Sequence, residues 1–228
     1  AEGFVRLGIS PAQIRVAGDL RFDLELLRVS APERQRLRAS FGLAEGDPVL
    51  VAGSTRKGEH EVILDAYAQA RLAIPGLRLI LAPRFNSEAP GVERRLEQQG
   101  IPWIRRTQLG HRARPPDAVI LLDTFGELPR VYALASFVFL GGSLYPQDRL
   151  GQNLIEPLAQ AVPIFLGSHM NHWREITREL LSVYAGLEVR GAAEITSGLT
   201  HLYQNPEGAA RLSCACQAVL ARKTGSLE

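Results

Sequence analysis

The stretch Pro48-Val49-Leu50-Val51-Ala52-Gly53-Ser54-Thr55-Arg56-Lys57-Gly58 decides the fold class. Its apolar half has the length of a strand buried on both faces, and it leads into Glu59 to Leu72, where apolar residues recur at the helical period. Similar apolar runs follow at Leu77 to Ala82, Ala118 to Leu122, Phe137 to Leu140, Val162 to Leu166 and Leu187 to Val189. Strands that alternate with helices predict an α/β fold with a doubly wound parallel sheet.

Three further segments have a helical pattern, namely Val92 to Gln99, Ala192 to Gln204 and Pro206 to Ala221. Gln13 to Asp23 precedes the first full strand and is interpreted as an arm. Thr107 to Pro116 mixes Arg, Gly and Pro without any period, which predicts an exposed loop.

The composition is that of an ordinary globular domain, with 228 residues, 46% hydrophobic and 22% charged. A net charge of +2 with scattered arginines argues against nucleic acid as a partner. No apolar run reaches the roughly 18 residues of a membrane helix, so we expect a soluble chain. It begins with Ala1 and not with Met, and we expect a piece of a longer protein. Cys214 and Cys216 stand too close for a disulfide framework or a four-ligand zinc site.

In an open parallel sheet the ligand site lies outside the carboxyl ends of the strands. The loops expected there are rich in glycine, hydroxyl groups and cations: Gly53 to Gly58, Ala82 to Arg84, Asp123 to Glu127, Gly141 to Ser143 and Gly151 to Asn153. Such loops suit a phosphate, to which Arg56, Lys57 and Arg84 add charge. Glycine-rich turns also simply end strands, and the pattern of any single loop leaves both interpretations open. None matches a dinucleotide fingerprint or a P-loop.

The segment from Asn153 to Glu156 has two compatible interpretations. Asn153 is a good N-cap, and Glu156 stands where it can accept from the Asn153 backbone N–H in a capping box. A carboxylate one turn inside a helix can equally accept hydrogen bonds from both hydroxyls of a ribose. Asp123 to Leu128 poses a similar choice, between backbone N–H groups that read a base edge and a turn in which Asp123 and Thr124 bond local backbone.

Catalytic groups are not evident in the sequence. The five histidines show no metal-ligand spacing, no Ser-His-Asp arrangement is visible, and no isolated carboxylate is marked as a base. We therefore expect no metal and no cofactor.

Six segments together resemble the ordered motifs of transferases of 3-deoxy-D-manno-octulosonic acid (Kdo): Gly18 to Asp23, Ala52 to Thr55 with Gly58-Glu59, Leu81 to Arg84, Asp123 to Leu128, Phe139 to Leu144 and Asn153 to Pro157. The resemblance implies the C-terminal domain of a GT-B glycosyltransferase, which is Rossmann-like with helices on both faces of the sheet and binds the CMP-Kdo donor. It divides the chain into a connector, residues 1–23, and a nucleotide-sugar-binding domain, residues 24–228.

Carried over by motif, the resemblance implies roles for single residues. Pro83 and Arg84 contact the CMP phosphate, and the departing phosphate is stabilised by Arg21. The remaining donor contacts fall on Ser54, Arg56, Gly142 and Ser143 at the pocket edge, on Phe125, Gly126 and Glu127 at the base, and on Asn153, Leu154, Ile155 and Glu156 at the phosphate and ribose.

For the whole enzyme, the resemblance implies inverting transfer of Kdo to lipid A precursor in lipopolysaccharide biosynthesis. No metal or cofactor takes part, and a carboxylate of the N-terminal domain acts as base, so we expect this chain to be inactive alone. The expected location is the cytoplasmic face of the bacterial inner membrane, with membrane contact only through the full-length protein.

Several positions depart from the family pattern. Arg21 replaces a lysine, Phe85 replaces the His after Pro-Arg, and Leu150 to Asn153 reads Leu-Gly-Gln-Asn where the family has Gly-Gly-His-Asn, after a short insertion near Tyr145 to Arg149. Phe85 cannot donate a hydrogen bond, so these departures concern the identity of the donor more than the fold. Two alternatives stay open: a GT-B transferase or epimerase that uses a UDP-sugar, and a non-catalytic Rossmann-like interaction module.

Overall fold

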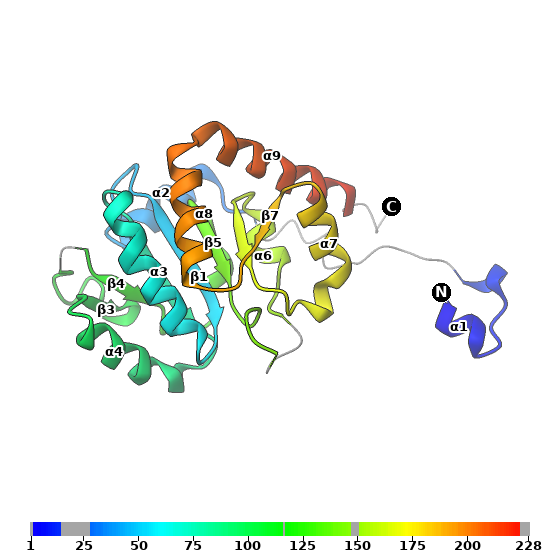
Figure 1. Cartoon of the computed structure of the whole chain (residues 1–228), viewed down its shortest axis with the longest axis horizontal. Helices are drawn as coiled ribbons and strands as arrows, with labels where there is room; N and C mark the ends of the chain where they lie inside the picture. The colour runs from blue at the N-terminus through cyan, green and yellow to red at the C-terminus, as the bar shows by residue number, and fades with distance from the viewer. Residues whose placement is uncertain (1, 15–27, 116, 147–150, 224–228) are drawn as a thin grey trace.

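A seven-stranded parallel sheet forms the centre of the protein (Figure 1). The computed structural model describes residues 2–14, 28–115, 117–146 and 151–223. The strand order is β3-β4-β2-β1-β5-β6-β7, and neighbouring strands pair in parallel. The bounds are β1 Val49–Thr55, β2 Arg78–Pro83, β3 Trp103–Arg105, β4 Val119–Leu121, β5 Phe137–Leu140, β6 Ile164–Leu166 and β7 Gly186–Glu188.

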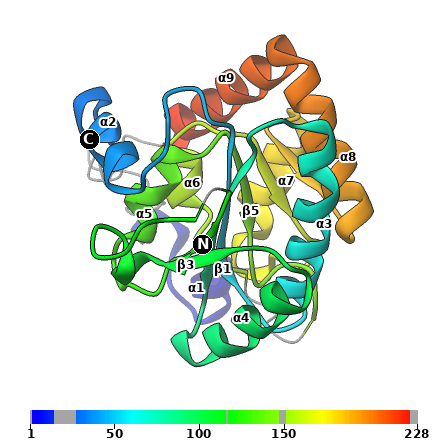
Figure 2. The same ribbon diagram turned by 90° about the vertical axis from the view of Figure 1, so that its left-hand side faces the viewer.

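Helices cover both faces of the sheet, as Figure 2 shows for α3 and α8 on one side and α2, α5 and α6 on the other. The first face carries α3 Glu59–Ala73, α4 Ala89–Gln98 and α8 Ala192–Gln204. The second carries α2 Ala31–Ser40, α5 Leu128–Val131, α6 Ile155–Ala159, α7 Arg174–Ser182 and α9 Pro206–Lys223. The N-terminal segment contains α1 Glu2–Arg6. Each face has its own apolar core.

Strand β1 shows why an uninterrupted apolar run is required at the centre of this sheet. Successive side chains of a strand point to opposite faces. Val49 and Val51 therefore pack into one core, and Leu50 and Ala52 pack into the other. All four side chains are fully buried, as the sequence predicts.

Most of the predicted elements are confirmed, including α8 with both its bounds. The edge strand β3 is absent from the prediction because it is short and carries a polar Arg105, so no apolar run marks it. Helix α2 is absent as well, although Ser30 caps it by accepting from the Glu33 N–H and Pro32 lies in its first turn. These are N-terminal helix signals that the sequence displays.

The carboxyl ends of β1 and β5 lie against each other without side chains between them. The Gly141 N–H donates to the Gly53 carbonyl at 2.8 Å. A methyl group added at Gly141 would lie 2.4 Å from the Ser54 carbonyl oxygen and 2.5 Å from the Thr55 Cα. Gly141 therefore allows the loop after β5 to pack directly against the end of β1. This agrees with the interpretation that glycine-rich turns end strands.

Gly141→Ala should therefore lower the free energy of unfolding by about 2 kcal/mol, because backbone atoms must move to accept the methyl group. The matched control is Gly191→Ala, since no atom lies within 4 Å of a methyl group at that position and its φ of 177° is ordinary extended backbone. Urea unfolding of both variants measures the difference. Equal stabilities would contradict the close packing of the two loops.

Candidate functional site

The predicted site residues that the structure describes lie at the carboxyl ends of the strands, around the point where the chain order of the sheet reverses. Strand β1 has β2 on one side and β5 on the other, so the loops that leave β1 and β5 diverge to opposite faces. Open α/β sheets bind their ligands at such a point. Ser54 at the end of β1 has a φ of 54°, a conformation that costs a non-glycine residue on the order of 1 kcal/mol and is typical of functional loops.

The buried carboxylate of Glu59 holds these two loops together. It accepts from the backbone N–H of Arg56 at 2.9 Å, of Gly142 at 2.7 Å, and of Ser143 and Leu144 at 2.9 Å each. The side chain is only 1% exposed. Glu59 is thus a positioning residue whose role the sequence signals only through the Gly58-Glu59 motif at the start of a helix.

Ser143, expected to line the pocket, is fully buried and does not present its hydroxyl there. The hydroxyl donates to the Leu140 carbonyl and accepts from the Gly167 N–H at 2.8 Å. It therefore joins the ends of β5 and β6. Gly142 has a φ of 68° and lies against the side chain of Gln152.

Ser54 and Arg56 lie on the same edge and are both partly exposed. The Arg56 guanidinium stacks 4.6 Å from the centre of the Phe85 ring. Phe85 thus offers an aromatic face to a cation at the position where the Kdo transferase motif has a histidine.

Glu156 is a partly buried carboxylate at this edge. Burial raises its pKa above the usual value, whereas the Asn153 amide and the Arg84 guanidinium act in the opposite direction. The Asn153 side-chain amide donates to Glu156 at 2.8 Å, and the Ile155 N–H donates to the side-chain Oδ1 of Asn153 at 3.1 Å. The predicted capping box is therefore wrong in detail, because Glu156 bonds the side chain of Asn153 and not its backbone, and the N-cap position falls on Leu154.

Leu154 and Ile155 turn their side chains into the core, where they are 0% and 3% exposed. Any ligand contact from these two residues is consequently a backbone contact. Arg84 is exposed beside partly exposed Pro83, and its N–H donates to the Thr55 carbonyl at 2.8 Å. The loop after β2 is thereby attached to the end of β1.

The loop after β4 is organised by its acidic residues. Asp123 accepts from the N–H and hydroxyl of Thr107 at 3.0 and 2.7 Å, so it bonds a neighbouring loop and not its own backbone. Glu127 accepts from Thr124 at 2.5 Å and from two nitrogens of Arg106.

Between these fixed ends, Phe125 is 85% exposed and Gly126 adopts a φ of 80°. A large apolar ring that is held out to solvent at the carboxyl ends of the strands is suited to stack on a planar group. Arg21 and the motif Gly18 to Asp23 lie outside the described residues.

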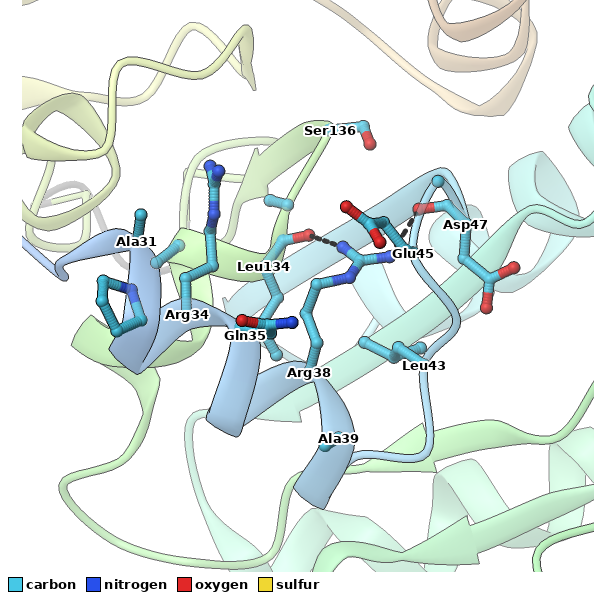
Figure 3. A pocket seen from close by; sticks show the side chains of 14 residues that line it. Ala31, Arg34, Gln35, Arg38, Ala39, Leu43, Glu45, Asp47, Leu134 and Ser136 are labelled. Carbon is cyan, nitrogen blue, oxygen red and sulfur yellow. Dashed lines mark hydrogen bonds between the residues drawn. The ribbon is translucent and has the colours of Figure 1, made fainter.

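A cavity of about 750 Å³ lies at the amino ends of β1 and β5 (Figure 3). It is lined by α2, the loop before β1 and the residues that precede β5. Arg38 is one of the lining residues and donates to the carbonyls of Asp47 at 3.1 Å and Leu134 at 3.4 Å, so this arginine joins the segments around the cavity. The cavity lies at the amino ends of the strands, away from the predicted site residues.

No group of three or more His, Cys, Asp or Glu side chains in the described residues is arranged to hold a metal. Nor does the described part of the chain contain a helix with the length and apolar character needed to cross a membrane.

Comparison with known proteins agrees with the geometry. No protein-family model matches the chain. It is 31% identical to the 3-deoxy-D-manno-octulosonic acid transferase of Haemophilus influenzae over 99% of the chain and 52% of that protein. The transferase of Bordetella pertussis is 32% identical over 92% of the chain and 49% of its own length. The crystal structure of the C-terminal CMP-Kdo binding domain of WaaA from Acinetobacter baumannii superposes with a TM-score of 0.74 at 25% identity, covering 89% of this chain and 99% of that domain.

The chain matches the C-terminal domain of the Kdo transferases. It spans about half the length of the curated Kdo transferases that it matches and has the fold of the family's C-terminal domain. The predicted fold class and family are therefore confirmed. A likeness to Anabaena HepE in complex with UDP-glucose, at 21% identity and a TM-score of 0.64, concerns the fold alone.

Proposed function

We propose that this chain is the donor-binding half of a Kdo transferase and holds a CMP-sugar, CMP-Kdo, at the carboxyl edge of its sheet. The observation that supports this most strongly is the setting of Glu156, a partly buried carboxylate with Arg84 acting on it. A ribose offers two hydroxyl donors to a carboxylate, and a phosphate needs a cation. A nucleoside monophosphate carries both groups a short distance apart.

The remaining contacts follow from this placement. Phe125 and Gly126 receive the base, Pro83 and Arg84 the phosphate, and Asn153 to Glu156 the ribose. The chemistry is electrostatic, since fixed positive groups stabilise the phosphate as its negative charge develops. Arg21 adds a cation for the departing phosphate, and the reaction uses no metal or cofactor.

The rest of the machinery belongs to a domain that precedes this chain in the full-length enzyme. That domain supplies a carboxylate base for the acceptor hydroxyl of lipid A precursor, so the chain alone does not turn over. Residues 1–23 form the connector to it, and residues 24–228 form the donor domain. The exposed apolar side chains of Phe4, Val5 and Leu7 in α1 and just after it support a connector that packs elsewhere. The full-length enzyme, and not this chain, meets the cytoplasmic face of the inner membrane.

Calorimetric titration with CMP, UMP and AMP tests the proposal. We expect CMP to bind best and Arg84→Ala to weaken it about tenfold, because one charge-assisted contact to phosphate is lost. Arg36→Ala is the matched control, since Arg36 is an exposed arginine on α2 and belongs to none of the loops of the proposed site. Preference for UMP would favour a UDP-sugar enzyme, and a folded chain that binds no nucleotide would favour an interaction module.

A further inference from the structure

Arg106 holds the loop that is proposed to receive the base. Its Nε lies 3.2 Å from Glu127 Oε2 and its Nη2 lies 3.1 Å from Glu127 Oε1, a two-bond fork to one carboxylate. Such forks fix both distance and plane, which a lysine cannot do. The Arg106 side chain is 18% exposed, so water screens the pair less than it screens a surface pair.

Arg106 is itself anchored to the rigid part of the fold. Its guanidinium lies 4.3 Å from the centre of the ring of Phe41, a fully buried core residue. Its Nη1 lies 3.4 Å from the carbonyl of Ser40, the last residue of α2. The planar side chain of Arg106 thus connects Glu127 to the core and fixes its position.

Glu127 has little capacity left for a ligand. Its carboxylate accepts two bonds from Arg106 and one from the Thr124 hydroxyl, out of about four acceptor positions. The groups that the loop presents to solvent are instead the exposed ring of Phe125 and the backbone at Gly126. The acidic residue therefore shapes the loop and does not read the base with its side chain.

We infer that Arg106 is a positioning residue for nucleobase recognition: through Glu127 it fixes Phe125 and Gly126 against the base without touching the ligand. This inference rests on the proposed function. Arg106 stands outside every segment that resembles the Kdo transferase motifs, 21 positions before Glu127. The link between the two residues exists only in the folded chain.

The experiment compares Arg106→Gln with Arg105→Gln. Arg105 is the adjacent arginine, and its Nε donates to Glu93 on α4 at 2.6 Å instead of to Glu127. Hydrogen exchange of the amides from 124 to 127 is measured without ligand, and CMP and ribose 5-phosphate are titrated by NMR. For Arg106→Gln we expect at least tenfold faster exchange and at least tenfold weaker CMP binding, with ribose 5-phosphate binding unchanged. Arg105→Gln should leave all three readouts within about twofold of wild type.

Arg106→Lys adds a second variant, which keeps the charge but not the fork, and we expect it to lose most of the CMP affinity while keeping thermal stability. Unchanged exchange in Arg106→Gln would overturn the inference whatever the nucleotide result. Equal loss of CMP and ribose 5-phosphate binding would also overturn it, since the effect would then not concern the base. If exchange rises in Arg106→Gln but the wild-type chain binds no CMP, the proposed function fails, and the role of Arg106 in base recognition fails with it. The faster exchange would then show only that Arg106 holds the loop.

Discussion

Glu59→Ala is expected to lower the free energy of unfolding by about 4 kcal/mol, roughly 1 kcal/mol for each of the backbone N–H groups that lose a buried acceptor. Four such groups, at Arg56, Gly142, Ser143 and Leu144, donate to this carboxylate. They belong to the loops after β1 and β5, so the loss also frees the two sides of the site from each other. Chemical denaturation measures the change.

Glu61→Ala provides the matched control in the same helix turn. Glu61 is exposed and accepts a single bond, from the Gly58 N–H at 3.0 Å. Losing such a cap costs about 1 kcal/mol or less. If the Glu59 variant is no less stable than the Glu61 variant, Glu59 does not hold the loops.

Glu156→Gln should weaken CMP binding about fiftyfold, because two hydrogen bonds from the ribose hydroxyls lose their ionised acceptor. The same variant should be more stable than wild type at pH 7. Burial raises the pKa of Glu156 in the folded state, so wild-type stability falls as the pH rises above the usual carboxyl value of 4.5. Glutamine carries no charge to desolvate, and the advantage of the variant should vanish below that pH.

A variant that gains stability but loses CMP affinity indicates that Glu156 binds a ligand, because the loss of a structural cap would lower stability. Glu175→Gln is the control, since Glu175 also stands in the first turn of a helix but is exposed on α7. It should change neither property measurably. Thermal unfolding from pH 4 to 8 with calorimetry at pH 7 decides the matter, and a Glu156 variant that binds CMP as wild type does would remove Glu156 from the site.

The central strands could be predicted because an apolar core packs against each of their two faces. A strand such as β1 must then be apolar on both faces where the two cores meet it, as it is from Val49 to Ala52, and that pattern is visible without any knowledge of neighbours. The edge strand β3 lacks this requirement on its outer side, and Arg105 at its end forms an ion pair with Glu93. Nothing local distinguishes such a short polar strand from a loop.

The candidate site could be predicted as a set of loops, but not as a set of roles. Ser143 and Glu127 stand in the right motifs, yet their side chains bond other parts of the protein. Conversely, Glu59 and Arg106 act across 83 and 21 positions of sequence, respectively. Which polar side chain faces the ligand and which holds a loop depends on packing between distant segments, and spacing in the sequence does not contain that information.

Amide chemical-shift mapping of this chain with CMP locates the bound nucleotide and so tests the proposed site. We expect saturable shifts concentrated at Phe125 to Glu127 and at Asn153 to Glu156, at the carboxyl ends of the strands. Shifts concentrated at the cavity lined by Arg34, Arg38 and Ser136 would contradict it, as would a folded chain whose spectrum CMP leaves unchanged.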